Sequence, residues 1–474
     1  MTTIDITPDQ RILRMLGKID FKAWQCLFEF IDNSIDSFSS KKILNPKIVI
    51  TIPPKNKITE GLKIKDNGIG MSEKELEKSL KAGFSGNNTL DNMGLYGMGS
   101  NIAMARLGDK TKIKTARKED DYWTEVEIDF FKLEREAKFE IETTKIKKTL
   151  EEKDVSGTTV TVIKLNEDIF KALFNKNFIK KKIGKTYGRV LKKYNIELLY
   201  NNEICPPFKY CLWNKSRHVN HHKHGNISAK IDINTVIDTK QYCYACWEWL
   251  LDTETVCPSC KKAENILDRK REVKGWLGIQ RYFDKEHYGI DLLRNGRVIE
   301  ELSHDFFYFE FEDGDQEKIR EYPVDGIHIG GRIVGELEID FVEVSQTKEA
   351  FIKATNDWKD VVNVVRGISP IQPDIAKRRG LPENLSPLAK LFAGYRKVKA
   401  GSDCLVAAEP QIVNDYVRKF YNNETDYQED DKFYELVLKG NSPKTKPSIT
   451  GTTKTVSGGN PFPSGLTTTA TPMP

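Results

Sequence analysis

The chain has 474 residues, of which 39% are hydrophobic, and its 74 basic residues nearly balance its 69 acidic residues. This length allows more than one hydrophobic core, so we expect two folded domains with appendages. A membrane-spanning apolar run and a signal-peptide pattern are both absent from the sequence, so we expect an intracellular protein without membrane contact.

The first informative segment is an expected helix that begins after Asp20. Glu29, Asn33 and Asp36 are spaced i, i+4 and i+7, so they share one stripe of this helix, with Asp32 at its flank. A carboxylate in such a stripe can activate a water molecule, and an amide oxygen can bind Mg²⁺. The alternative is an ordinary solvated face. The apolar residues that mark the buried face are Ala23, Trp24, Leu27, Phe28 and Ile31.

A tight turn follows two expected strands, which cover residues 46–52 and 61–65. Residues 66–71 read Asp-Asn-Gly-Ile-Gly-Met, and the two glycines allow the backbone to approach a ligand closely. Ser72 and Glu75 then form a capping box for the next helix. Asp66 is therefore expected at a strand-to-helix junction.

A glycine-rich loop covers residues 94–99, which read Gly-Leu-Tyr-Gly-Met-Gly. It opens onto an expected helix that ends at Gly108, and the backbone N–H groups at such a helix start favour anions. The loop is not a dinucleotide-binding fingerprint, because Ile102 stands where a third glycine is needed. The sequence also lacks a Walker A loop. The phosphate site is therefore of another kind.

These segments resemble the motifs of the GHKL (Bergerat-fold) ATPases. The patterns are Glu-x-x-Asp-Asn-x-x-Asp, Asp-x-Gly-x-Gly and Gly-x-x-Gly-x-Gly, and residues 156–160 resemble the last nucleotide-contacting motif of the family. Its members include the DNA gyrase B subunit, MutL, heat-shock chaperones, sensor histidine kinases and MORC proteins. The resemblance implies ATP and Mg²⁺ as cofactors.

The resemblance also implies a role for individual residues. Glu29 is the expected general base, Asn33 the Mg²⁺ ligand and Asp36 a supporting acid. Asp66 is expected to accept a hydrogen bond from the adenine amino group, with help from Thr158. The lid over the phosphates is expected at residues 84–99. The other expected nucleotide contacts are Gly68, Gly70, Met71, Gly94, Tyr96, Gly97, Met98 and Gly99.

A later motif indicates which relatives the chain resembles most. Residues 345–348 read Ser-Gln-Thr-Lys, and gyrases carry Gln-Thr-Lys where a second domain sends a lysine to the γ-phosphate. Lys348 is therefore the expected sensor of the triphosphate, with Gln346 beside it; the alternative is a surface lysine. Residues 289–299 also resemble second-domain strands of MORC and MutL proteins. Sensor histidine kinases lack this domain and are set aside.

The expected architecture is α+β. A Bergerat-type two-layer sandwich covers residues 1–185, and an S5-like transducer domain covers residues 186–385. A helical region is expected at residues 386–440. The tail, residues 441–474, is rich in Thr, Ser, Pro and Gly and is expected to be disordered.

Four of the eight cysteines form two Cys-x₂-Cys pairs inside the second domain, in an expected zinc-knuckle insert at residues 240–262. Two such pairs suit a tetrahedral structural zinc ion, and disulfides are the weaker alternative. The expected ligands are Cys243, Cys246, Cys257 and Cys260. A histidine-rich segment, residues 218–224, is expected to be a solvated loop.

The expected function is ATP-gated conformational change with lid closure and homodimerisation. DNA is the expected partner, in a MORC- or MutL-like manner. The alternatives are a protein-directed chaperone-like ATPase and an ATP-switched scaffold with little hydrolysis. The net charge of +5 does not decide between them. The lysines at 180–182 and 192–193 form either a basic strip or ordinary solvated faces.

Overall fold

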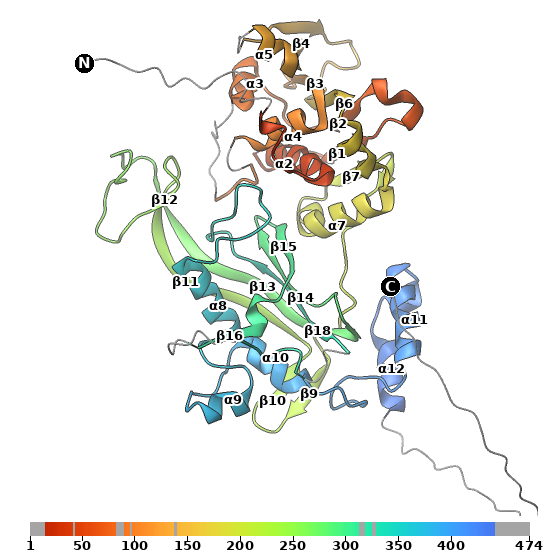
Figure 1. Cartoon of the computed structure of the whole chain (residues 1–474), viewed down its shortest axis with the longest axis vertical. Coiled ribbons are helices and arrows are strands. Elements are labelled where there is room, and N and C mark those ends of the chain that lie inside the picture. Colours follow the sequence, from red (N-terminus) through yellow and green to blue (C-terminus); the bar gives the residue numbers. More distant parts are fainter. Residues whose placement is uncertain are drawn as a thin grey trace, which may run out of the picture.

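The computed structural model describes residues 15–40, 43–81, 90–94, 97–136, 140–311, 318–324 and 329–440. Two hydrophobic cores organise them, one around an eight-stranded sheet and one around a six-stranded sheet. The sheets follow one another along the long axis of the molecule (Figure 1). The mixed α+β architecture expected from the sequence is confirmed.

The first sheet has the strand order β5-β4-β3-β6-β2-β1-β7-β8. All neighbours are antiparallel except β1 and β7, which run parallel. Alternate residues of β2 are buried, so one face of this strand packs on the core. The strands are β1 (Lys47–Thr51), β2 (Leu62–Asp66), β3 (Gly108–Ala116), β4 (Tyr122–Asp129), β5 (Thr143–Lys147), β6 (Gly157–Leu165), β7 (Glu197–Tyr200) and β8 (Glu203–Ile204).

Helices complete the first domain. α2 packs against α4, and α4 contacts β3 and β6. α3 begins with the expected capping box: Ser72 Oγ accepts from the Glu75 N–H at 3.3 Å, and the Glu75 carboxylate accepts from the Ser72 N–H at 2.8 Å. The helices are α2 (Ala23–Ser40), α3 (Glu73–Leu80), α4 (Gly99–Leu107), α5 (Phe130–Glu136), α6 (Glu167–Phe170) and α7 (Lys176–Lys193).

The boundary between the domains lies later than the expected residue 185. α7 runs through that position, and β7 pairs with β1 along its whole length, from Lys47 with Glu197 to Ile50 with Tyr200. Leu198 and Tyr200 are buried in the first core. The first domain therefore extends to about residue 205, because its sheet needs β7 to cover the edge of β1.

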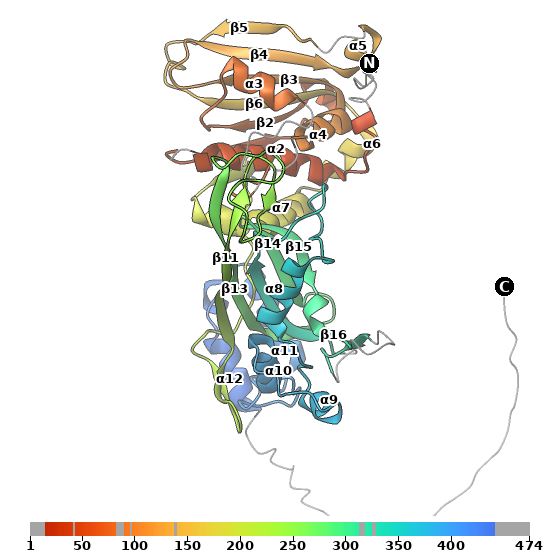
Figure 2. The ribbon, with the colours of Figure 1, turned by 90° about the vertical axis from the view of Figure 1, so that its left-hand side faces the viewer.

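The second sheet has the order β12-β11-β13-β18-β14-β15, and only β14 and β18 pair in parallel. β11 and β13 form a long hairpin that reaches toward the first domain (Figure 2). β12 and the four paired cysteines lie at its end. The strands are β11 (Lys230–Cys243), β12 (Glu248–Trp249), β13 (Ile266–Asp284), β14 (Gly289–Arg294), β15 (Arg297–Ser303) and β18 (Gly331–Glu338).

The expected helical region at residues 386–440 is not a separate unit. Phe392, Phe420 and Phe433 are buried in the same core as the second sheet. Arg332 of β18 also donates to the carbonyl oxygens of Tyr395, Cys404 and Leu405, which fixes the connection after α10. The helices are α8 (Asn356–Arg366), α9 (Pro373–Arg378), α10 (Pro387–Tyr395), α11 (Pro410–Tyr421) and α12 (Asp431–Lys439). The expected disordered tail, 441–474, lies outside the described residues.

The histidine-rich segment is a hairpin rather than the expected loop. β9 (His218–His221) pairs antiparallel with β10 (Gly225–Ser228), and Val219 and Ile227 bury their side chains in the second core. Val219 and Ile227 lie opposite each other in this hairpin, and their burial explains why an otherwise polar segment forms two strands. Among the described residues, the helices are too short or too polar to cross a membrane.

Candidate functional site

A cavity of about 1200 Å³ lies between the two domains and gathers most of the expected site residues. Its walls come from α2, the turn after β2, the start of α4, β6 and a turn of the second domain. The expected residues that line it are Glu29, Asn33, Asp36, Asp66, Gly70, Met71, Gly94, Gly97, Met98, Gly99, Thr158, Gln346 and Lys348. Gly68 does not line the cavity, and its N–H donates to Asp66 Oδ1. Tyr96 and part of the expected lid at 84–99 fall outside the described residues.

The three residues of the stripe on α2 differ in their burial and in their hydrogen bonds. Glu29 is buried, whereas Asn33 is exposed and can reach an ion in the cavity. The Asp36 carboxylate accepts from the backbone N–H groups of Met93, at 2.9 Å, and Gly94, at 2.8 Å. Burial raises the pKa of Asp36 to about 6, although these two bonds oppose the rise. Asp36 therefore holds the glycine-rich segment against α2.

Asp66 is a buried acceptor at the end of β2. Its Oδ1 accepts from the N–H groups of Gly68, at 2.9 Å, and Thr158, at 3.2 Å, while Oδ2 accepts from Ser34 Oγ at 3.3 Å. Burial raises the pKa of Asp66 to about 6 against the effect of these bonds. Since each carboxylate oxygen has about two acceptor positions, Oδ2 keeps one position free for a ligand.

Two glycines in the site are required by close contacts. Gly70 has a φ of +67°, and a Cβ there would lie 1.9 Å from the Ala116 carbonyl oxygen. A Cβ at Gly99 would lie 1.8 Å from Oε2 of Glu29. The start of α4 can therefore approach the Glu29 carboxylate only because residue 99 has no side chain.

Lys348 reaches the cavity from a tight turn of the second domain. Its φ is +54°, an uncommon conformation for a residue with a side chain. Ser345 closes the turn: its carbonyl oxygen accepts from the Lys348 N–H at 2.9 Å, and its hydroxyl accepts from the N–H groups of Glu349 and Ala350. The turn is further tied to α2 by a bond from Gln25 to the Glu349 carboxylate.

The ammonium group of Lys348 lies between two carboxylates of α2. It is 3.0 Å from Glu29 Oε2 and 2.8 Å from Asp32 Oδ2, and all three side chains are buried. Burial alone would lower the pKa of Lys348, but the charges of Asp32 and Glu29 raise it above its ordinary value. Lys348 is therefore a buried, charged lysine, and the alternative of a surface lysine is excluded.

Three residues of this cluster were not expected from the sequence. Asp32, at the flank of the stripe, does not line the cavity and is fully buried. Tyr187 donates to its Oδ1 at 2.7 Å, and Arg297 donates to its Oδ2. The sequence pattern gave no signal for Tyr187 or Arg297, because both contacts join segments more than 150 positions apart.

The second domain also contacts the residues just before the glycine-rich loop. Arg269 of β13 forms an ion pair with Asp91, with a nitrogen–oxygen distance of 2.5 Å. The side-chain amide of Asn295 donates to the carbonyl oxygen of Asn92 at 3.1 Å. The base of the expected lid is thus held by α2 on one side and by the second domain on the other.

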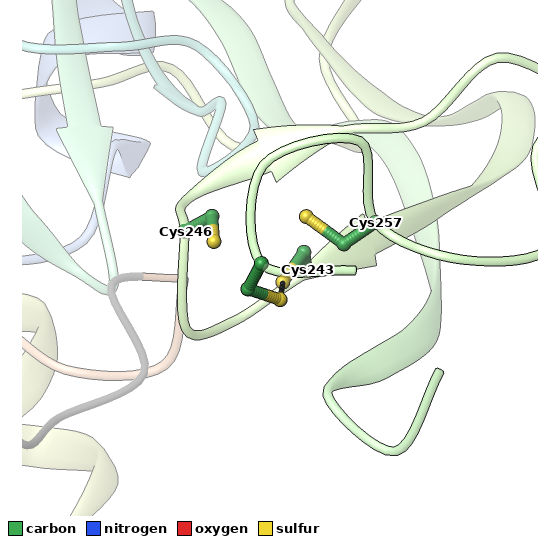
Figure 3. Close-up of side chains that lie close together, drawn as sticks. Cys243, Cys246 and Cys257 are labelled. Carbon is green, nitrogen blue, oxygen red and sulfur yellow. Dashed lines mark hydrogen bonds between the residues drawn. The ribbon is translucent and has the colours of Figure 1, made fainter. Parts of the chain in front are cut away.

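The four paired cysteines come together at the end of the β11–β13 hairpin. Their sulfur atoms all lie within 4.8 Å of one another, and the sulfurs of the labelled residues face a common space (Figure 3). Only Cys243, Leu250 and Cys257 are buried in the small local core. Four thiolates with this spacing could hold a tetrahedral zinc ion with no open position. Among the described residues, the histidines form no such group.

The lysine clusters are partly neutralised by neighbouring acids. Lys180 pairs with Glu203 at 3.0 Å, and Lys182 pairs with Glu301 at 2.9 Å. These contacts indicate that the lysines of α7 form a solvated, ion-paired helix face rather than a continuous basic strip.

Comparison with known proteins finds a family match within the first domain. Residues 21–158 match the family model of histidine kinase-, DNA gyrase B-, and HSP90-like ATPases. The matched segment begins just before α2 and ends at Thr158, so it contains every nucleotide-contacting residue expected in the first domain. No curated protein matches the chain.

Proposed function

We propose that this chain, whose first domain is a GHKL-type ATPase domain that takes ATP as its ligand, hydrolyses ATP in a site completed by its second domain. The observation that carries the proposal is the position of Lys348. Its ammonium group lies 3.0 Å from Glu29 in the wall of the cavity that also contains Asp66 and the glycine-rich segment. A base, a cation and an anion-binding backbone thus meet in one cavity.

Adenine recognition is assigned to Asp66 and Thr158. The free acceptor position on Asp66 Oδ2 suits the exocyclic amino group of adenine, which is a hydrogen-bond donor. Guanine presents a carbonyl oxygen at the corresponding ring position, and an ionised carboxylate would repel it. The site should therefore select adenine over guanine nucleotides.

The phosphates are assigned to the segment from Gly94 to Gly99 and to the first turn of α4. N–H groups at a helix start favour negative charge, and Gly99 allows the chain to run close to Glu29. Mg²⁺, when bound, would neutralise phosphate charge. The exposed amide of Asn33 is the residue that would hold it.

Hydrolysis is assigned to Glu29 and Lys348. When Lys348 leaves Glu29 for the γ-phosphate, the Glu29 carboxylate becomes free to accept a proton from a water molecule. That water attacks the γ-phosphorus, the bond to the bridging oxygen breaks, and ADP and phosphate are the products. The ammonium group then stabilises charge on the transferred phosphoryl group.

We further propose that closure of the lid couples nucleotide state to homodimerisation and that the protein acts on DNA in a MORC- or MutL-like way. Support for the coupling comes from Arg269 and Asn295, which link the second domain to the base of the lid. Support for DNA rests on the resemblance of the second domain alone. The chaperone-like and scaffold alternatives use the same pocket.

The cysteine cluster is assigned to a structural zinc ion. The four thiols lie close enough to share one ion, and zinc binding needs them reduced, which suits an intracellular protein.

One experiment separates these alternatives. ATP turnover is measured with and without double-stranded DNA at low salt, alongside sizing of the protein with a non-hydrolysable ATP analogue. Turnover that DNA stimulates, together with an analogue-dependent dimer, supports the full proposal. Turnover without any DNA affinity favours the chaperone-like alternative, and tight ATP binding without turnover favours the scaffold. If ATP does not bind at all, the proposal is wrong.

A further inference from the structure

The buried carboxylate of Asp32 accepts hydrogen bonds from three side chains, two of which are cationic. Tyr187 donates to Oδ1 at 2.7 Å, and Lys348 and Arg297 both donate to Oδ2. Asp32 is completely shielded from solvent. It does not line the cavity, so it cannot itself touch a nucleotide.

The charges around Asp32 are balanced. Glu29 and Asp32 contribute two negative charges from α2, and Lys348 and Arg297 contribute two positive charges from the second domain. The rings of Phe28 and Tyr187 lie about 6 Å from the Arg297 guanidinium and keep water away from it. Since an unpaired charge is costly in such surroundings, each group must keep a partner.

Of the two cations in this balance, Lys348 is the one that has a role in the proposed reaction. To reach the γ-phosphate it must leave Asp32 as well as Glu29. Glu29 lines the cavity and meets water or substrate when Lys348 leaves. Asp32 has no such access. When Lys348 leaves, Arg297 is the cation that still pairs with the Asp32 carboxylate, and without Arg297 this buried charge would be unpaired.

We infer that Arg297 is a positioning residue for ATP hydrolysis: as the permanent counter-ion of Asp32, it leaves Lys348 free to transfer to the γ-phosphate. This inference rests on the proposed ATPase function. Arg297 acts through Lys348 and does not contact the nucleotide. Burial alone would lower the pKa of Arg297, but the charges of Asp32, Tyr187, Glu29 and Asp36 together raise it above its ordinary value. The guanidinium therefore remains charged.

The test compares Arg297→Gln with the double variant Asp32→Asn/Arg297→Gln. In the single variant, Lys348 is the only ionic partner left to Asp32 among the described residues and stays with it, so kcat should fall by at least about tenfold. The preference for the non-hydrolysable ATP analogue over ADP, measured as the ratio of their Kd values, should fall in parallel. The double variant removes the carboxylate charge that retains Lys348, so both quantities should recover by at least about fivefold from the single variant.

The control is Arg281→Gln. Arg281 is also a buried arginine, but it does not line the cavity, and it donates to the carbonyl oxygens of Leu212, Tyr427, Gln428 and Glu429. Its replacement should lower the melting temperature without changing the ratio of Kd values. This control distinguishes a general loss of stability from a specific effect on Lys348.

The outcomes are distinct. If the wild-type protein neither binds nor hydrolyses ATP, the proposed function is wrong and the inference fails with it. If the wild-type protein is active and Arg297→Gln matches it in kcat and in the Kd ratio, only the inference is wrong. If Arg297→Gln does not fold, the double variant decides: turnover supports the inference, and a folded but inactive double variant overturns it.

Discussion

The side-chain amine of Lys348 lies 3.0 Å from the carboxylate of Glu29, although 319 positions separate the two residues in the chain. Glu29 belongs to α2 of the first domain and Lys348 to a turn of the second. The ammonium group therefore occupies the place beside the proposed base. The candidate active site is complete only when the two domains are docked.

The role of Glu29 is tested by Glu29→Gln. Because the amide cannot take a proton from water, ATP turnover should fall by about a hundredfold or more. ATP affinity should change by no more than a few fold, because adenine and phosphate contacts are assigned elsewhere. Turnover in a coupled assay and ATP binding by calorimetry check both parts. Glu60→Gln, on the surface, is the matched control, and retained turnover in Glu29→Gln would show that another group is the base.

The raised pKa of Asp66 predicts a specific pH dependence of stability. Because its folded-state pKa is about 6 and the ordinary value is 3.8, the folded protein binds the proton more tightly than the unfolded chain does. The contribution of Asp66 to the free energy of unfolding therefore falls as pH rises from about 4 to about 6, by up to about 3 kcal/mol for a shift of about two units.

Asp66→Asn removes this contribution. The free energy of unfolding of the variant minus that of the wild-type protein should therefore be larger at pH 7 than at pH 4. The expected increase in this difference is on the order of 3 kcal/mol. Urea unfolding at the two pH values measures the difference. Asp232→Asn, at an exposed position, controls for the general effect of losing a carboxylate. Equal effects of Asp66→Asn at both pH values would contradict the burial argument. The variant should also bind ATP more weakly.

Zinc removal should act locally. The end of the β11–β13 hairpin buries only Cys243, Leu250 and Cys257, which is too small a core to order it without an ion. Cys257→Ser should lower the bound zinc well below one equivalent and make residues 244–262 sensitive to protease. Metal analysis and limited proteolysis measure these effects, with Cys404→Ser as the control.

ATP turnover should stay within about threefold in Cys257→Ser. The hairpin meets the base of the lid through Arg269 and Asp91, a partly exposed ion pair that contributes no more than about 1 kcal/mol. A complete loss of turnover on zinc removal would show that the cysteine cluster has a larger role in the active site than a structural one.

Local sequence patterns were sufficient to predict the parts of the site that lie within short segments. The i, i+4, i+7 spacing of Glu29, Asn33 and Asp36 places all three on the cavity, because the geometry of a helix is fixed. The capping box at Ser72 and the metal-like grouping of the cysteines were predictable for the same reason.

The contacts between distant segments were not predictable from these patterns. The pairing of β7 with β1 depends on an open sheet edge that the sequence of residues 197–200 does not reveal. Arg297 reaches Asp32 only after the two domains dock, and Tyr187 reaches it from α7, which lies 155 positions away in the chain. The sequence therefore predicts no role for Asp32, because its position on the helix indicates only that it flanks the stripe.

The central claim is that hydrolysis needs the lysine supplied by the second domain. Single-turnover ATP hydrolysis by Lys348→Ala, with ATP saturating, tests it most directly, since saturation separates chemistry from binding. The rate should fall by about a hundredfold or more, while ADP affinity stays within a few fold of wild type. A Lys348→Ala rate within about threefold of the wild-type rate would show that the first domain hydrolyses ATP without this residue, and the two-domain active site would be wrong.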